Sequence, residues 1–295
     1  MATAPESAAL VALLRVGSRP WPEYSELLEQ LGSAGKALEQ ELTDTNGQTS
    51  LLPRDPDPLI AQASSDIAGW QAAGIELLTV LDRDYPDNLK AVHDRPPLLF
   101  VDGALTAQDS RAIAVIGTRA PSPSGLRTAR RAAQQLVAGG FTVVSGLAAG
   151  IDTAAHTAAL QARHGRTVAV VGTGVKRSYP PQNAALQRTI AERGAVVSQF
   201  WPDAPPTRQS FPLRNATMSG LALATVVIEA SARSGARIQA RRALAHGRPV
   251  FLQRQVLAEP WANALAQRPG THVIDDPEEI ASVVDRLTDP GTLIG

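Results

Sequence analysis

The chain has 295 residues, enough for one large domain or two ordinary ones, and a hydrophobic fraction of 44% that can form a substantial core. It contains no cysteine, which excludes a disulfide scaffold and any zinc site built on cysteine. No apolar stretch approaches the roughly 20 residues of a membrane span, and the N-terminus lacks the basic region of a signal peptide, so we expect a cytoplasmic protein with no membrane partner.

The net charge of zero conceals an uneven distribution. Residues 1–110 carry 7 basic and 17 acidic residues, residues 111–270 carry 20 basic and 5 acidic, and residues 271–295 carry 1 basic and 6 acidic. Nineteen of the 20 basic residues in the middle are arginines, whose planar guanidinium suits phosphates and bases. A codon usage that favours arginine would explain why arginine is used instead of lysine, but it would not explain why acidic residues are scarce. The positive charge of this region therefore predicts a polyanionic partner.

The first part of the chain has helical patterning. Apolar residues repeat with a helical period across residues 7–42 and again across residues 59–73. Turn formers and prolines dominate residues 44–58, which predicts a loop or linker. We therefore predict a helical domain over residues 1–72, followed by a second domain over residues 73–295 that begins with a short strand and a turn.

From residue 111 onward, strand-like apolar runs alternate with helical segments rich in alanine and arginine. The predicted strands are 113–117, 141–146, 167–172, 195–200, 224–230 and 249–252, and the predicted helices are 124–138, 152–163, 182–193 and 236–246. Near-continuous Val and Ile runs between helices indicate a parallel sheet buried on both faces. The predicted fold class is therefore a doubly wound α/β domain, which binds ligands at the carboxyl ends of its strands.

Glycine-rich loops follow the first three of these strands. Their candidate phosphate-binding residues are Gly117, Thr118 and Arg119, then Ser145, Gly146 and Gly150, then Gly172 and Gly174. Glycine lets the backbone approach an anion closely. The G-x-G-x-x-G fingerprint of dinucleotide folds and the Walker G-x-x-x-x-G-K-[ST] motif are both absent, so we expect neither NAD nor ATP. Asp152 is placed to cap the helix that follows the second loop.

Arg119 is the distinctive residue of the first loop. An arginine directly after a strand can bind a phosphate through two N–H groups. The alternative is an ion pair with an acid, which the scarcity of acids in this region makes less favourable. Lys176, in the third loop, precedes Tyr179 and two prolines that stiffen it.

Phe211 lies outside any helical or strand period, next to Arg214 and Asn215. This composition is typical of a base-stacking platform with a phosphate contact, but Phe211 could equally cover an edge of the sheet. Further along, Glu229 ends a predicted strand, and the sequence then leads into a helix through the candidate residues Arg233, Ser234 and Gly235.

Together these motifs resemble a known family. AVIGTR, VVSGLAAGIDTAAH, VAVVGTG…YP, FPLRN…SGL and VVIEASARSG are similar, in order and spacing, to the DNA-processing protein A (DprA/Smf) family over roughly residues 75–285. The resemblance implies an extended Rossmann-like fold, single-stranded DNA binding in a basic pocket, a homodimer, and loading of RecA recombinase onto strands during natural transformation. The N-terminal helices are loosely similar to the family's sterile-alpha-motif-like domain.

The resemblance also implies roles for individual residues. Arg119 would hold a DNA phosphate, and the turn lining the pocket would be formed by Ser145, Gly146 and Gly150. The pocket would also contain Lys176, Phe211, Arg214 and Asn215.

Several positions depart from the family pattern. Ala216 replaces the last arginine of FPxRNR, Gln239 stands where a threonine is expected, and FLQRQVL lacks the family's proline and glycine. Many relatives continue into a winged helix beyond the position of Gly295. These departures touch the pocket and its rim, so a divergent paralogue with another role, for instance in phage defence, is an alternative.

No catalytic constellation emerges from the sequence. The five acids of the basic region show no metal-ligand spacing, the five histidines are scattered, and the Asp152 and His156 pair is more typical of a cap and a packed residue than of a metal site. We expect no catalytic residue, metal or cofactor. The alternative is a nucleotide sensor or a nucleotide phosphoribohydrolase-like enzyme using Glu229, but the expected P-G-G-x-G-T-x-x-E motif is absent.

Overall fold

The computed structural model describes residues 3–44 and 55–288. The chain begins with three short helices, α1 (Ala4–Val16), α2 (Trp21–Leu31) and α3 (Ala34–Asp44), and a longer helix, α4 (Asp57–Ala72), follows. Helix α2 ends at Gly32, whose φ of 64° lies in the left-handed region that glycine adopts without strain. The helical patterning predicted for residues 7–42 and 59–73 is confirmed, whereas most of the predicted loop over 44–58 lies outside the described residues.

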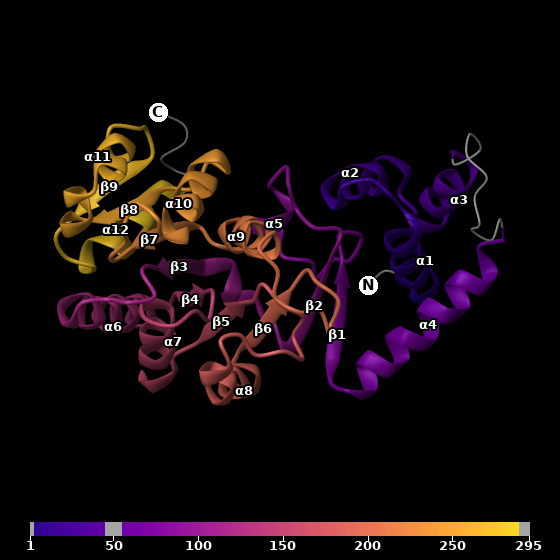
Figure 1. Cartoon of the computed structure of the whole chain (residues 1–295), viewed down its shortest axis with the longest axis horizontal. Helices are drawn as coiled ribbons and strands as arrows, with labels where there is room; N and C mark the ends of the chain where they lie inside the picture. Colours follow the sequence, from indigo (N-terminus) through magenta and orange to yellow (C-terminus); the bar gives the residue numbers. More distant parts are fainter. Residues whose placement is uncertain (1–2, 45–54, 289–295) are drawn as a thin grey trace.

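A nine-stranded mixed sheet forms the centre of the molecule (Figure 1). Its order is β1-β2-β6-β5-β4-β3-β7-β8-β9. The strands are β1 (Ile75–Thr79), β2 (Leu98–Gly103), β3 (Ala112–Ile116), β4 (Thr142–Ser145), β5 (Thr167–Val170), β6 (Ala195–Ser198), β7 (Ala224–Val227), β8 (Val250–Gln253) and β9 (Thr271–Ile274). Strands β3 to β9 run parallel, and at one edge β2 pairs antiparallel with β6 and β1 pairs antiparallel with β2.

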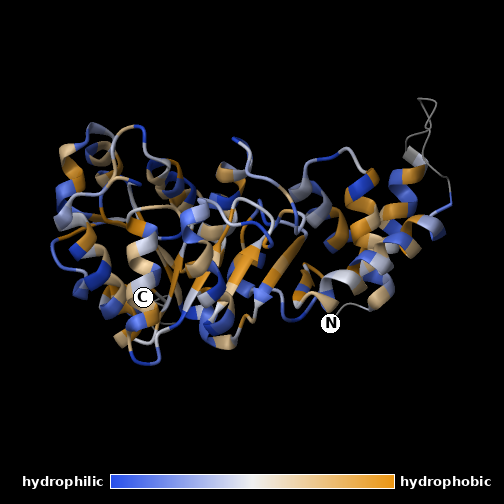
Figure 2. Cartoon of the chain, turned by 60° about the horizontal axis from the view of Figure 1, so that its bottom comes forward, coloured by the Kyte–Doolittle hydropathy of each residue, from blue (hydrophilic) through white to orange (hydrophobic). Residues whose placement is uncertain are grey.

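Helices cover both faces of this sheet. One face packs against α5 (Asp87–Lys90), α9 (Ser210–Leu221), α10 (Gly235–Ala245) and α11 (Pro260–Ala266). The other packs against α6 (Pro123–Ala138), α7 (Ile151–Gln161), α8 (Ala184–Arg193) and α12 (Glu278–Thr288). Within β3, Ala114 packs on the first face and Ile113 and Val115 on the second. Burial on both faces explains the unbroken apolar runs, which appear as hydrophobic strands in Figure 2.

The predicted α/β class, with a mostly parallel doubly wound sheet, is confirmed, and all six predicted strands and four predicted helices are present. Two strands, β2 and β9, and three helices, α9, α11 and α12, were not predicted from the sequence. Phe211 was placed outside any helical or strand period, but residues 210–221 form α9. Proline at the third position of α9 concealed this helix, but in the first turn a proline costs no hydrogen bond.

Aromatic side chains join the N-terminal helices to the sheet. Trp70 of α4 meets Phe100 of β2 edge-on at 4.9 Å, and both rings contact Trp201, which follows β6. Trp21 of α2 adds a further edge contact to Trp201 at 5.7 Å. Large aromatic rings bury much apolar surface, so this cluster holds α2 and α4 against the antiparallel edge of the sheet.

Candidate nucleic-acid interface

A cavity of about 400 Å³ opens at the carboxyl ends of β3, β4 and β7. Strand β3 lies between β4 and β7, so the chain runs to opposite sides of the sheet from this point. Doubly wound sheets bind ligands at such a switch point. Four chain segments form the wall: Ile116, Gly117, Thr118 and Arg119; Ala148 and Asp152; Phe211, Arg214, Asn215 and Met218; and Ser231, Arg233, Ser234, Gly235, Ala236 and Gln239.

The loop after β3 is fixed by Glu229 at the end of β7. The Thr118 amide donates to the Glu229 backbone oxygen at 2.6 Å, while Ser122 donates its hydroxyl to the Glu229 carboxylate at 2.8 Å and its amide at 3.1 Å. Ser122 also caps α6, accepting from the Gly125 amide. A Cβ on Gly117 would lie 2.5 Å from the side chain of Ile151, so this close approach requires glycine.

Arg119 is exposed at the rim of the cavity. Its guanidinium carbon lies 5.7 Å from the centre of the Phe211 ring. Among the residues that the structure describes, no acid forms an ion pair with it, in contrast to Arg166, which is bound to Asp109. The positive charge of Arg119 therefore faces solvent over an aromatic ring, which is an arrangement suited to a phosphate and its base.

The loop after β4 is braced from several sides. Asp152 was predicted to cap α7, but its buried carboxylate instead accepts from the Gly146 and Ala148 amides at 3.1 and 3.3 Å. Ser145 donates its hydroxyl to the Val115 backbone oxygen. These bonds hold Leu147 at a φ of 56°, which a branched residue adopts only under external constraint. The loop is thus a rigid part of the cavity.

Arg214 does not project into solvent. It is buried, and Nη1 donates to the backbone oxygens of Gly146 at 2.6 Å and Val170 at 2.8 Å, while Nε donates to Asn215 at 3.0 Å. Burial lowers the pKa of Arg214 and raises the pKa of Asp152, and the opposite charge of each partner counteracts the shift. Arg214 lines the cavity, but most of its donors support the two loops behind it.

Phe211 stands on the first turn of α9 and is half-buried, so part of its ring is accessible. Tyr179 lies beside it at 5.6 Å, and the two rings border a second, smaller cavity of about 80 Å³. Arg119 and Arg214 line both cavities. Gly172 lies beneath the Phe211 ring, which a Cβ there would approach to 2.9 Å.

Candidate residues from the loop after β7 are also brought to the cavity. Arg233 is exposed, and Ser234 caps α10 by accepting from the Ala236 amide at 3.2 Å. Gly235 begins the helix. Met218 and Ser231 were not predicted at the cavity, because their place in the wall depends on how α9 and α10 pack.

Five candidates line neither cavity: Ser145, Gly150, Gly172, Gly174 and Lys176. The ammonium of Lys176 contacts the Asp203 carboxylate at 3.2 Å, and its amide donates to the Pro202 backbone oxygen. Gly174 packs against the backbone of Trp201, which leaves no room for a Cβ. Gly150, with a φ of 84°, packs against the loop after β3 and shapes the cavity from outside.

The potential catalytic and metal-binding groups lie elsewhere. The Glu229 carboxylate is engaged by Ser122 and is not part of the cavity wall. His156 is buried with Nδ1 against the Thr167 hydroxyl at 2.7 Å, and burial lowers its pKa to about 3. The side chains of Asp152 and His156 are thus both engaged in contacts within the fold.

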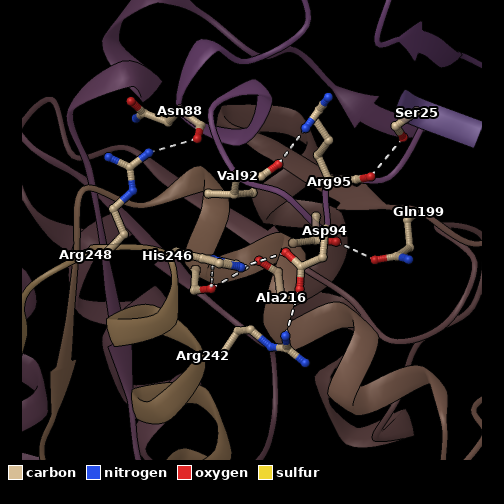
Figure 3. A network of polar contacts seen from close by, with 12 residues as sticks. Ser25, Asn88, Val92, Asp94, Arg95, Gln199, Ala216, Arg242, His246 and Arg248 are labelled. Carbon is tan, nitrogen blue, oxygen red and sulfur yellow. Dashed lines mark hydrogen bonds and ion pairs between the residues drawn. The ribbon is translucent and has the colours of Figure 1, made fainter. Parts of the chain in front are cut away.

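Two of the histidines that appear scattered in the sequence meet in space. His93, Asp94 and His246 bring their ligand atoms within 4.8 Å of one another. Figure 3 shows that His246 faces Asp94, at 2.6 Å, and that Arg242 contacts the same carboxylate, at 2.9 Å. Together these groups tie residues 93–94 to the C-terminal end of α10.

The same region also links the N-terminal helices to the sheet. Ser25 of α2 donates to the Arg95 backbone oxygen, and Arg95 donates to the Val92 backbone oxygen at 3.0 Å (Figure 3). Arg248 donates to the backbone oxygen of Asn88 at 2.9 Å. Residues 88–95 therefore form a polar junction between three parts of the molecule.

The fold and the cavity define a Rossmann-like α/β protein with an arginine-rimmed, glycine-lined site at the switch point of its sheet. The family model described as DNA recombination-mediator protein A matches residues 76–285. The chain therefore belongs to the DprA/Smf family of DNA recombination-mediator proteins.

Individual relatives agree with this assignment. The chain is 43% identical over 180 residues to protein Smf of Synechocystis, a match covering 60% of this chain and 45% of that relative. A crystal structure of DNA processing protein A from Streptococcus pneumoniae aligns over 95% of both chains with a TM-score of 0.68 and 29% identity. A structure of DNA processing protein A from Helicobacter pylori, concerned with its single-stranded DNA binding mode, aligns over 71% of this chain and 95% of that one with a TM-score of 0.63 and 26% identity.

The chain spans about half the length of the curated relatives from Synechocystis and Escherichia coli. Within the described residues, each helix is too short or too polar to cross a lipid bilayer.

Proposed function

We propose that this protein binds single-stranded DNA along the surface that joins the two cavities, and that it acts there as a recombination mediator. The observation that carries the proposal is the exposed Arg119 guanidinium over the half-buried Phe211 ring, between the cavities that both residues line. Flexible single strands can stack bases on aromatic rings while cations contact their phosphates, whereas a duplex keeps its base faces covered.

Tyr179 and Arg233 each extend this surface at one of the two cavities. Tyr179 is 40% exposed beside Phe211 at the smaller cavity, and the exposed Arg233 lines the larger one. Spaced cations and rings of this kind form a track for several nucleotides rather than a pocket for one. The enzyme alternative has less support, because Glu229 is engaged by Ser122 outside the cavity wall.

Family membership extends the proposal to a cytoplasmic homodimer that loads RecA onto the bound strand. The support is the family match over residues 76–285 and the alignment with the Streptococcus pneumoniae structure over 95% of both chains. Light scattering after size exclusion should give twice the chain mass of 31.0 kDa. RecA-dependent strand exchange on DNA coated with single-strand-binding protein should accelerate when the protein is added, and no acceleration would contradict the mediator role.

The binding step is tested by fluorescence anisotropy with one oligonucleotide in single-stranded and duplex form at equal salt. We expect the single strand to bind more tightly, and Arg119→Ala to weaken binding by about 1.5–3 kcal/mol, the contribution of a charge-assisted hydrogen bond. Arg188→Ala, which removes an exposed arginine from α8, is the matched control. Equal affinity for both forms, or an Arg119→Ala protein that binds like the control, would contradict the proposal.

A further inference from the structure

His246, which directly follows α10, is held in one orientation by Ser219 of α9. Its Nδ1 atom lies 2.7 Å from the Ser219 hydroxyl oxygen, and that hydroxyl donates its single hydrogen to the Ala216 backbone oxygen at 3.1 Å. Ser219 therefore accepts a hydrogen bond from the Nδ1–H group of His246. A neutral imidazole with its proton on Nδ1 carries a lone pair on Nε2, so His246 presents this lone pair to the group that faces Nε2.

The group that faces Nε2 of His246 is a second acceptor. Asp94 places its Oδ1 atom 2.6 Å from Nε2 (Figure 3). A carboxylate oxygen and an unprotonated imidazole nitrogen both carry lone pairs, so they approach this closely only with a proton or another cation between them. A proton in that position makes an ion pair of imidazolium and carboxylate. A metal ion can replace the proton, because neutral imidazole and carboxylate are both metal ligands.

His93 provides a third potential ligand next to this pair. The rings of His93 and His246 lie 5.5 Å apart between centres, and the ligand atoms of His93, Asp94 and His246 all lie within 4.8 Å of one another. Zinc binds its ligands at about 2.0–2.2 Å, so neighbouring ligand atoms around a tetrahedral ion lie about 3.3 Å apart. The Nε2–Oδ1 separation of 2.6 Å would thus widen by about 0.7 Å, and His93 would approach by at most about 1.5 Å. His93 is exposed and Asp94 is partly exposed, so both can make these shifts, and the ion has a path from solvent.

We propose that His93, Asp94 and His246 bind one zinc ion through two imidazole nitrogens and Oδ1 of the carboxylate. A water molecule takes the fourth position, on the side of the exposed His93. Two imidazoles and one carboxylate suit zinc better than magnesium or calcium, which prefer oxygen ligands. Asp94 and His246 are 152 residues apart in the sequence, so the ion fastens the segment before β2 to the end of α10. This inference is independent of the proposed function, and it differs from the expectation of no metal drawn from the sequence.

Two neighbouring side chains act on this site in opposite directions. Arg242 contacts Oδ2 of Asp94 at 2.9 Å, so it orients the carboxylate and leaves Oδ1 for the ion, but its positive charge repels a cation and lowers the affinity. Ser219 raises the affinity, because an outer partner that fixes the ring and the tautomer of a histidine improves it as a metal ligand. Ser219 is therefore a positioning residue for the ion.

The test is calorimetric titration of the untagged, chelator-treated full chain with zinc chloride, which should reveal one site per chain. His93→Asn should weaken zinc binding by about 100-fold, because losing a direct ligand costs at least as much as losing an outer partner, which costs about 10–100-fold. The matched control is His164→Asn, the same change at an exposed histidine whose φ of 58° asparagine tolerates, and it should bind zinc like the wild type. A wild type that binds no zinc, or a His93→Asn protein that binds it equally well, would overturn the inference.

Thermal stability gives a second measurement of the same site. A ligand that binds the folded state raises the melting temperature, and this ion joins two distant segments of the fold. Excess zinc should therefore raise the melting temperature of the wild type and of His164→Asn, and it should leave that of His93→Asn unchanged. His93 is exposed, so its replacement should preserve the fold, which circular dichroism checks. A rise of equal size in His93→Asn would place the ion elsewhere and overturn the inference.

Discussion

Replacing Arg214 with methionine separates a structural role from a DNA-binding role. The buried guanidinium donates to the Gly146 and Val170 backbone oxygens at 2.6 and 2.8 Å and to Asn215 at 3.0 Å. Methionine fills much of the space but donates nothing, so two carbonyl oxygens and the Asp152 carboxylate lose their positive partner. Leaving a buried acceptor without its donor costs about 1–3 kcal/mol, so with two carbonyl oxygens affected we expect the free energy of unfolding to fall by about 2–6 kcal/mol.

Urea unfolding followed by circular dichroism measures this change in the free energy of unfolding. The comparison requires that this free energy falls with urea concentration at the same slope in the variant and the wild type. Arg233→Met, at an exposed position on the opposite wall, is the control and should change the unfolding free energy by less than about 0.5 kcal/mol. If Arg214→Met instead unfolds like the wild type but binds single-stranded DNA poorly, Arg214 contacts the phosphate directly. The structural account of this residue would then be refuted.

Three further predictions concern the same surface and the core behind it. Arg119 and Arg233 are exposed arginines of the larger cavity, and each phosphate contact contributes roughly −0.7 to the slope of log K against log salt for single strands. The slope should therefore be about −1.4 in the wild type and about −0.7 in Arg119→Ala. A slope unchanged by Arg119→Ala would contradict a phosphate contact at Arg119. Phe211→Ala should weaken single-strand binding by about 1–3 kcal/mol by anisotropy while Phe211→Tyr retains it, and equal losses in both would argue against stacking. Burial lowers the pKa of His156 to about 3, below its value of about 6.5 in the unfolded chain, so the unfolded state takes up the proton first as the pH falls. The free energy of unfolding should therefore decline as the pH falls from about 6.5 towards 3. Thermal melts of His156→Gln should show a shallower decline of the melting temperature between about pH 6.5 and 4.5.

The sequence predicted the sheet well because its strands are buried on both faces. Runs such as Ile113–Ile116 have no polar interruption, and the glycine-rich loops after β3, β4 and β5 mark where each strand ends. Strands β2 and β9 were missed: no strand was predicted for the apolar residues 98–101 of β2, and β9 is half-exposed, unlike the predicted strands. The division of the chain at residue 72 stays a prediction.

The candidate site was predicted less completely, because side-chain roles depend on contacts between distant segments. Arg119 sits directly after its strand, so sequence position alone placed it at the cavity. The sequence also indicated that Arg214 could bind a phosphate. Its hydrogen-bond partners, the backbone oxygens of Gly146 and Val170, lie 68 and 44 residues away, and the sequence does not identify them as acceptors. Lys176 was assigned to the pocket from its loop, whereas the structure pairs it with Asp203, 27 residues on.

Glu229 affects how fast the proposed site could bind a DNA strand. This one residue accepts hydrogen bonds from both ends of the segment from Thr118 to Ser122, through its backbone oxygen and its carboxylate. Each backbone residue that need not be immobilised on binding saves about 1–2 kcal/mol of conformational entropy. In the proposed function, the segment carrying Arg119 is therefore ordered before a DNA strand arrives, so that only the flexible nucleic acid has to be oriented. In that role, an anionic residue in a basic region would increase the fraction of collisions that end in binding.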